Sequence, residues 1–185
     1  MLEDELQLIN ALRDESTRRV AFEKMVRKYQ EQVYHTVRRM VLVHEDADDI
    51  VQNVFIKAWQ GLDGFRADSS LGTWLYRIAS HETIDFLQKQ KHLGVSLDDD
   101  EKKSAQYVAS KLESDPYFDG DETEIQLQQA IASLPKKQRL VFNMKYFDEM
   151  KYEDISAALG TSVGALKASY HLAVQKISAF FGLHD

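Results

Sequence analysis

An apolar period close to 3.6 residues runs through most of this chain and constrains its fold more than any other feature. Alternation of β-branched and polar residues is scarce, and only 2 prolines and 8 glycines interrupt the 185 residues. The pattern predicts an all-α protein. We expect helices at roughly 2–14, 17–42, 45–61, 70–91, 123–133, 136–147, 151–159 and 162–181.

The helical pattern fails between residues 92 and 121, where acids, serines, glycines and a proline are mixed. Residues 93–124 hold ten acids and three bases, which equals the whole net charge of −7. The chain before this stretch has fifteen acids and thirteen bases, and the chain after it has five acids and seven bases. Such asymmetry marks a boundary. We predict two small helical domains, 1–92 and 123–185, joined by an acidic flexible linker at 93–122, with room for a short helix around 103–112.

Several classes of protein are excluded by what the sequence lacks. Without cysteine, the chain has no disulfides, thiolate metal sites or thiol nucleophiles. No HExxH motif, phosphate-binding glycine loop or histidine cluster is present, so we expect no enzyme activity, no metal and no cofactor. The acidic start of the chain does not resemble a signal peptide, and no apolar run is long enough for a membrane helix. We therefore expect a cytoplasmic protein.

The helix expected around residues 46–59 has two distinct faces. A helical projection groups six residues on a core stripe: Ile50, Val51, Val54, Phe55, Ala58 and Trp59. The opposite face is polar with one large aliphatic residue, and it contains Asp49, Gln52, Asn53, Ile56 and Lys57. From the residues alone, two interpretations fit: a solvated face with one stray apolar residue, or a docking surface for a partner.

The stretch "FRADSSLGTWLYRIASHETIDFLQKQK" begins as a loop and continues as a helix that Ser69 or Ser70 can cap. Its predicted core stripe contains Leu71, Leu75, Ile78, Ala79 and Phe86, and its outward face contains Arg77, Ser80, His81, Ile84, Gln88 and Lys91. Aromatic rings and cations together can hold single-stranded DNA. The residues equally fit a helix in which Trp74 packs in the core and the bases are solvated.

The C-terminal stretch has the helix-start, turn and capping residues that are typical of a helix-turn-helix. Pro135 suits a helix start, Gly160 suits a left-handed turn, and Thr161 or Ser162 can cap the last helix. The predicted inward residues of that helix are Val163, Leu166, Tyr170, Ala173, Ile177 and Phe181. Small residues near the start of its outward face would allow close approach to a DNA groove. A simple αα-hairpin is the alternative interpretation.

Two blocks, "ADDIVQNVFIKAW" and "GFRADSSLGTWLYRIA", resemble the most characteristic stretch of bacterial sigma factors, with the extracytoplasmic-function (ECF) group as the best match. The resemblance covers about 17–92 and 123–181, in the family's order. It implies an alternative sigma factor that binds core RNA polymerase, recognises promoter DNA and assists strand opening. By the same resemblance, the acidic linker threads toward the active-site and RNA-exit channel of the polymerase, where its charge would mimic RNA. From the residues alone, a plain solvated tether fits equally well.

The resemblance also implies roles for individual residues. The residues expected to bind core polymerase are Asp49, Gln52, Asn53 and Ile56. The residues expected at the −10 element are Phe65, Arg66, Ala67, Asp68, Ser69, Ser70, Trp74, Arg77, His81 and Lys91, with the loop forming a pocket for an extruded base. The residues expected at the −35 element are Ser162, Gly164, Ala165, Lys167, Ala168 and His171.

The chain departs from the family at several of these positions. Asn53 stands where the family often has Glu, and His81 stands where it usually has Asn. Ser169 and Leu172 occupy positions that usually carry Arg. Fewer phosphate contacts mean weaker binding to free DNA, so we predict that the isolated chain binds promoters poorly. Tethering both weak modules on polymerase would raise their effective concentration.

Two other functions remain open from the residues: a dimeric helix-turn-helix regulator with an N-terminal sensing domain, and a protein–protein adaptor without DNA contact. The resemblance further implies an anti-sigma factor as a partner. The promoter sequence, the regulon, the inducing signal, the identity of the anti-sigma factor, the oligomeric state and the arrangement of the two domains are not encoded in any pattern that we can read.

Overall fold

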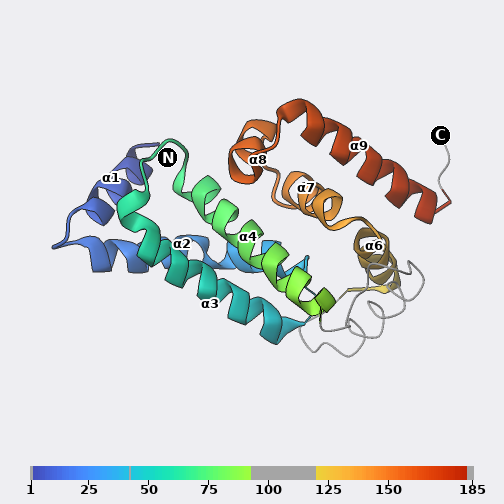
Figure 1. The fold of residues 1–185 in the computed structure, drawn as a ribbon, viewed down its shortest axis with the longest axis horizontal. Helices are drawn as coiled ribbons and strands as arrows, with labels where there is room; N and C mark the ends of the chain where they lie inside the picture. Colours follow the sequence, from blue (N-terminus) through green and yellow to red (C-terminus); the bar gives the residue numbers. More distant parts are fainter. Residues whose placement is uncertain (1, 42, 93–119, 183–185) are drawn as a thin grey trace.

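The computed structural model describes residues 2–41, 43–92 and 120–182 (Figure 1). The N-terminal helices are α1 (Leu2–Arg13), α2 (Arg18–Arg38), α3 (His44–Gly61) and α4 (Leu71–His92), with a 3₁₀ turn η1 (Leu62–Gly64) after α3. The C-terminal helices are α6 (Glu122–Ala132), α7 (Lys136–Tyr146), α8 (Tyr152–Leu159) and α9 (Val163–Phe180). The described residues contain no β-strand, so the all-α prediction is confirmed.

The predicted helix boundaries agree closely with those of the structure. The largest difference is at α2, which was expected to reach residue 42 but ends at Arg38. The periodic pattern did not indicate η1, because a single 3₁₀ turn is too short to produce a period. The short helix considered at 103–112 lies outside the described residues.

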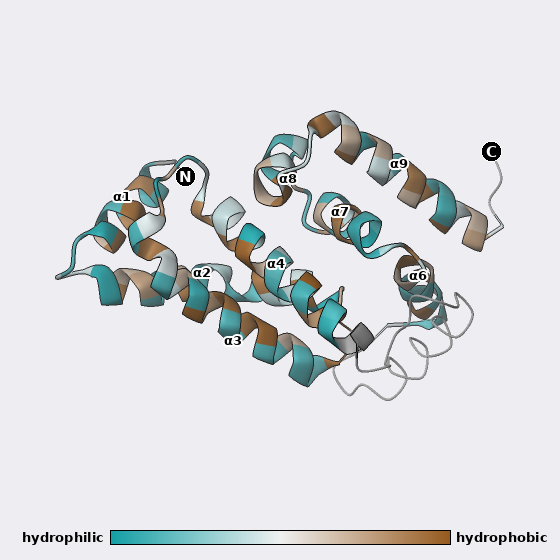
Figure 2. Cartoon of the chain, viewed as in Figure 1, coloured by the Kyte–Doolittle hydropathy of each residue, from teal (hydrophilic) through white to brown (hydrophobic). Residues whose placement is uncertain are grey.

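The N-terminal helices pack around one apolar core. Each helix contributes one side: Leu12 from α1, Met25 from α2, Val54 from α3 and Leu75 from α4 are all buried. Brown and teal bands alternate along α3 in Figure 2, as expected for a helix with one buried stripe. Burial of the apolar side chains from all four helices is the main favourable term that holds them together.

The C-terminal helices form two smaller apolar clusters around α7. Leu140 and Met144 of α7 meet Ile155 of α8 and Leu166 of α9, while Phe142 packs on α6 and the far part of α9. Two predicted turn features are confirmed. Gly160 adopts a left-handed conformation with φ of 63° at the end of α8, and the Ser162 Oγ accepts from the Ala165 amide at 3.3 Å.

The two halves of the chain share a core, which the linker composition did not predict. Met40, just after α2, is buried in the same cluster as Leu140 and Ile155, and Tyr76 and Leu87 of α4 pack against that cluster. Figure 1 shows α4 lying between α3 and the C-terminal helices. The arrangement of the two halves in this chain is therefore set by direct packing.

Two predicted orientations are wrong. Trp59, placed on the core stripe of α3, is 44% exposed and packs edge-on against Phe22, because it lies at the margin of the stripe near the end of the helix. Ser80, placed on the outward face of α4, is buried at 2% exposure. Its hydroxyl donates to the Tyr76 carbonyl at 2.6 Å, which satisfies the polar group inside the helix packing.

Candidate polymerase and DNA interfaces

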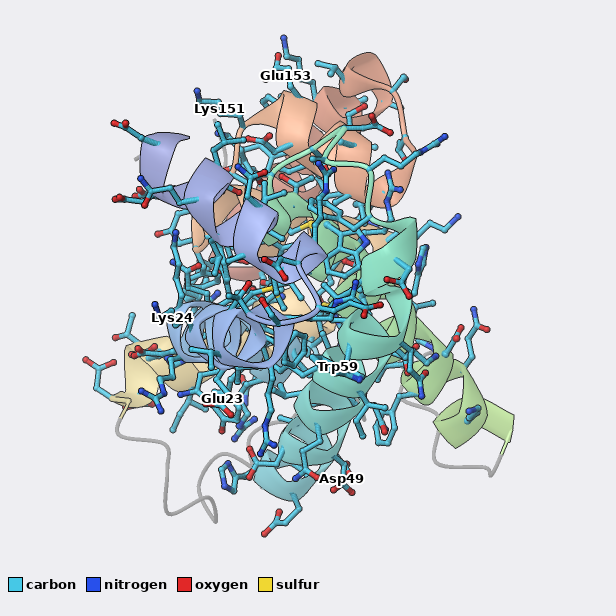
Figure 3. All side chains as sticks on the ribbon, turned by 90° about the vertical axis from the view of Figure 1, so that its left-hand side faces the viewer. Glu23, Lys24, Asp49, Trp59, Lys151 and Glu153 are labelled. Carbon is cyan, nitrogen blue, oxygen red and sulfur yellow. The ribbon has the colours of Figure 1, made fainter. Side chains whose placement is uncertain are left out.

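The α3 outer face consists of Asp49, Gln52, Asn53 and Ile56, and all four residues are exposed. Ile56 is 54% exposed, although the opposite side of the helix is buried at Ile50 and Val54. Within the described part of the chain, none of the four makes a side-chain hydrogen bond or an ion pair. Figure 3 shows Asp49 projecting from the outer edge of the molecule. The structure thus brings these four predicted residues together on one uncovered surface.

Loop 65–70 joins η1 to α4 and has a defined shape. The buried Phe65 ring lies 4.8 Å from the ring of Trp74, so the loop is anchored on the core at its start. Ala67 takes a left-handed φ of 61°, and the Arg66 guanidinium lies 3.4 Å from Asp68 on the exposed side. The Ser70 Oγ accepts from the Thr73 amide at 3.0 Å, which confirms the predicted cap of α4.

The outward face of α4 is partly covered by the C-terminal helices. Arg77 points toward α8, where its Nε donates to the Ala157 carbonyl at 3.1 Å and its terminal nitrogen donates to the same oxygen. His81, one turn further along, is exposed. The side chain of Lys91 lies outside the described residues. Sequence periodicity predicted that Arg77 and His81 share a face, but it did not predict that α8 reaches this face.

A polar cluster between the two halves was missed by sequence reasoning. Asp148, in the turn after α7, accepts from the Thr36 hydroxyl at 2.7 Å and from the Arg39 guanidinium at 2.7 Å. Its side chain is only 6% exposed. Burial raises the pKa of the Asp148 carboxyl, and the Thr36 hydrogen bond and the Arg39 charge oppose that shift only partly. Burial, followed by the charge of Asp148, raises the pKa of the neighbouring Tyr76 to about 12.

The α9 outer face consists of the six residues predicted for the −35 element: Ser162, Gly164, Ala165, Lys167, Ala168 and His171. All of them are exposed. A side chain added at Gly164 would meet open space, so the start of this face is free of obstruction. Leu172 extends the surface with an apolar side chain that is 46% exposed. The geometry suits a helix that inserts its N-terminal part into a groove.

No group of three or more His, Asp or Glu side chains that could hold a metal ion occurs among the described residues. In the same part of the chain, every helix is too short or too polar to cross a membrane.

Comparisons with known proteins agree with this architecture. The Sigma-70 region 2 family matches residues 25–93, and the Sigma-70 region 4 family matches residues 124–177. The chain is 33% identical over 156 residues to the ECF RNA polymerase sigma factor SigW of Bacillus subtilis, covering 82% of this chain and 83% of that protein. It is 34% identical over 153 residues to the ECF RNA polymerase sigma-E factor of Escherichia coli K12, covering 80% of each.

Solved structures share the fold. The structure of CnrH in complex with the cytosolic domain of CnrY matches with a TM-score of 0.70 at 21% identity, covering 98% of this chain and 99% of that chain. The sigma factor RpoE from Bartonella quintana, in complex with the anti-sigma factor NepR, matches with a TM-score of 0.67 at 20% identity, covering 89% and 98%.

A region 2 helical unit followed along the chain by a region 4 helical unit defines a sigma-70-type initiation factor. More narrowly, the chain belongs to the ECF sigma factors, so it is an alternative sigma factor that directs promoter recognition and transcription initiation.

Proposed function

We propose that this sigma factor binds core RNA polymerase through the α3 outer face. The observation that carries the proposal is the combination of Ile56 and Asp49 on an uncovered surface of a helix whose opposite side is buried at Ile50 and Val54. Single exposed aliphatic residues are common on protein surfaces. The family's use of this helix for docking, together with the lack of side-chain partners for Asp49, Gln52 and Asn53 among the described residues, is what favours a docking surface here. Asn53, where the family often has Glu, would alter one polar contact.

Loop 65–70 and the outward face of α4 are proposed to open the −10 element. Phe65, Arg66, Ala67, Asp68, Ser69 and Ser70 would form the pocket for an extruded base, with Trp74 supporting the loop. Arg77, His81 and Lys91 would contact the strand. Extrusion of the base costs a few kcal/mol of stacking free energy, which contacts between the base and the pocket must offset. An imidazole both donates and accepts, so His81 can replace the usual Asn as a polar contact.

The α9 outer face is proposed to bind the −35 element in the major groove. Lys167 is its one cation, with His171 beside it, so this face offers few phosphate contacts. We infer domains at 1–92 and 123–185 with a linker at 93–122. Weak binding by each domain is offset when polymerase presents both to the same DNA.

We further propose that this sigma factor is not itself a catalyst and that it works in the cytoplasm, where it positions promoter DNA for the polymerase. An anti-sigma factor is a proposed partner, supported by the similarity in fold to RpoE from Bartonella quintana, a sigma factor co-crystallised with the anti-sigma factor NepR.

Reconstitution tests this function. Core polymerase with this chain should initiate from a promoter selected out of a random DNA library, and core polymerase alone should not. Absence of a run-off product with the chain present would refute the proposal. A two-fold symmetric footprint without polymerase would favour the dimeric regulator instead.

A further inference from the structure

Helix α1 lies outside the stretch that matches region 2, which begins at residue 25. It is nevertheless firmly packed: Ile9 and Leu12 are buried in the N-terminal core. The Thr17 hydroxyl donates to the Ala11 carbonyl at 2.8 Å, and the Arg18 Nε donates to the Leu12 carbonyl at 3.0 Å. The turn between α1 and α2 is thereby held in one conformation.

From this anchored position, the chain reaches both ends of loop 65–70. At the far end, the Glu5 carboxylate accepts from the Leu71 amide at 2.7 Å, at the first residue of α4. At the near end, the Arg18 guanidinium lies 3.0 Å from the Asp63 carboxylate in η1. In Figure 1 the start of α1 lies beside the segment that leads into α4. The loop is therefore bracketed by two contacts from residues that precede the matched region.

The Glu5 contact is the stronger of the two. The first amides of a helix lack intrahelical acceptors, and a carboxylate there gains both a charge-assisted hydrogen bond and a favourable interaction with the helix dipole. Glu5 is half-buried, whereas Asp63 is 80% exposed. Packing adds to the effect, because a side chain at Gly72 would meet the Tyr29 ring at 3.3 Å. The start of α4 thus has little freedom to shift.

We propose that Glu5 and Arg18 are positioning residues for base recognition, holding the two ends of loop 65–70 so that its pocket is formed before the promoter base enters. The inference rests on the proposed role of this loop at the −10 element. A pocket that is already formed avoids the entropic cost of ordering the loop during strand opening. It also discriminates bases more sharply, because a mobile loop adapts to the wrong base.

The test uses holoenzyme reconstituted from core polymerase and the full chain, with promoters that carry each of the four bases at the position read by the loop. Glu5→Ala should reduce discrimination between the correct and incorrect bases by roughly threefold to tenfold, as expected for loss of part of a charge-assisted hydrogen bond. Affinity for core polymerase should not change. Glu5→Gln keeps an oxygen acceptor for the Leu71 amide and should retain most of the discrimination.

The matched control is Glu3→Ala, which removes the same charge from an exposed position in the same turn of α1. Equal effects of the Glu3 and Glu5 substitutions, or unchanged discrimination in Glu5→Ala, would overturn the proposal. If Glu5→Ala does not fold, Glu5→Asp replaces it, since it keeps the charge but withdraws the acceptor by one methylene, and the same criteria apply. Failure of the wild-type holoenzyme to initiate would instead refute the proposed function.

Discussion

The α3 outer face and the outward face of α4 lie in the same half of the molecule, yet one is open and the other is partly covered. Asp49 and Ile56 are exposed and touch no distant segment through a hydrogen bond or ion pair among the described residues, while Arg77 donates to a carbonyl of α8. Both faces were expected to be exposed because each is polar with a helical period. The difference teaches that periodicity predicts which side chains point away from the core of their own half of the molecule. It does not predict whether a distant segment of the chain covers those side chains.

The largest expected effect concerns the open face. Asp49→Lys combined with Ile56→Ala should weaken binding to core polymerase by about 30-fold or more, because loss of a hot-spot residue at the centre of an interface costs about 2 kcal/mol or more. The matched control combines Glu23→Lys with Val20→Ala on α2, where both residues are exposed and Glu23, within the described residues, makes only a 3.6 Å pair with Arg19. Titration of labelled polymerase measures both variants. Normal assembly of the first variant would show that the open face of α3 is merely solvated.

The next prediction removes the polar cluster that joins the two halves. Asp148→Ala leaves the Arg39 guanidinium without its carboxylate partner and leaves the Thr36 hydroxyl only the Gln32 carbonyl at 3.0 Å, so it should lower the free energy of unfolding by about 1–3 kcal/mol. Fluorescence energy transfer between dyes on the two halves should fall in the same variant. Glu153→Ala, at an exposed site in the first turn of α8 (Figure 3), should change stability by less than about 0.5 kcal/mol. Equal stability of the two variants would contradict a stabilising cluster.

Much of the fold could be predicted from local pattern, since caps and turns act over a few residues. Gly160 and Ser162 take the predicted conformations because a left-handed turn and an amide-accepting hydroxyl depend only on adjacent backbone. The contact between Asp148 and Thr36 joins positions 112 residues apart, and no local signal marks either residue. Trp59 was misplaced because an angular projection does not show that a residue at the margin of the stripe, near the end of α3, is only partly covered by α2.

The features of the candidate site also fall into two groups: those that local pattern predicted and those that depend on contacts between distant segments. Exposure of Ile56 and of Gly164 followed from helical periodicity. The contact of Arg77 with α8 did not, because it depends on how the C-terminal helices pack on α4. The role of Glu5 was also missed: an acid in the first turn of α1 is explained by that helix's own dipole, which conceals its contact with the amide of Leu71.

A third prediction tests whether Arg77 binds promoter DNA in addition to its hydrogen bond with α8. Arg77→Ala in the holoenzyme should weaken promoter binding by about threefold to tenfold and reduce the slope of log affinity against log salt by about 1. Arg19→Ala is the control, because the Arg19 side chain is 89% exposed on α2 and its one ion pair in the described part of the chain is with Glu23. Unchanged promoter affinity together with altered stability would assign Arg77 to packing between the halves.

The smallest expected effect concerns pH and the Asp148 carboxyl. Its pKa is raised above the ordinary 3.8 in the folded chain, chiefly by burial. The folded state then binds the proton more tightly than the unfolded state, so the free energy of unfolding falls as pH rises from the unfolded pKa through the folded pKa. Asp148→Asn keeps an acceptor for Thr36 but does not titrate. The stability of the wild type relative to this variant should therefore fall across that window, by less than about 1.4 kcal/mol for each pKa unit.

Asp14 provides a control of opposite sign. Hydrogen bonds from Ser16 lower the pKa of its exposed carboxyl, so its stabilising contribution is present at neutral pH and is lost as pH falls through its folded pKa. The stability of the wild type relative to Asp14→Asn should rise with pH, whereas relative to Asp148→Asn it should fall. If both differences rise with pH, the pairing of Asp148 with Arg39 and Thr36 outweighs its burial, and the cluster is a favourable ion pair. The packing of the C-terminal helices on α4 would then be most stable at neutral pH, because the charged form of Asp148 would be the form that joins the two halves.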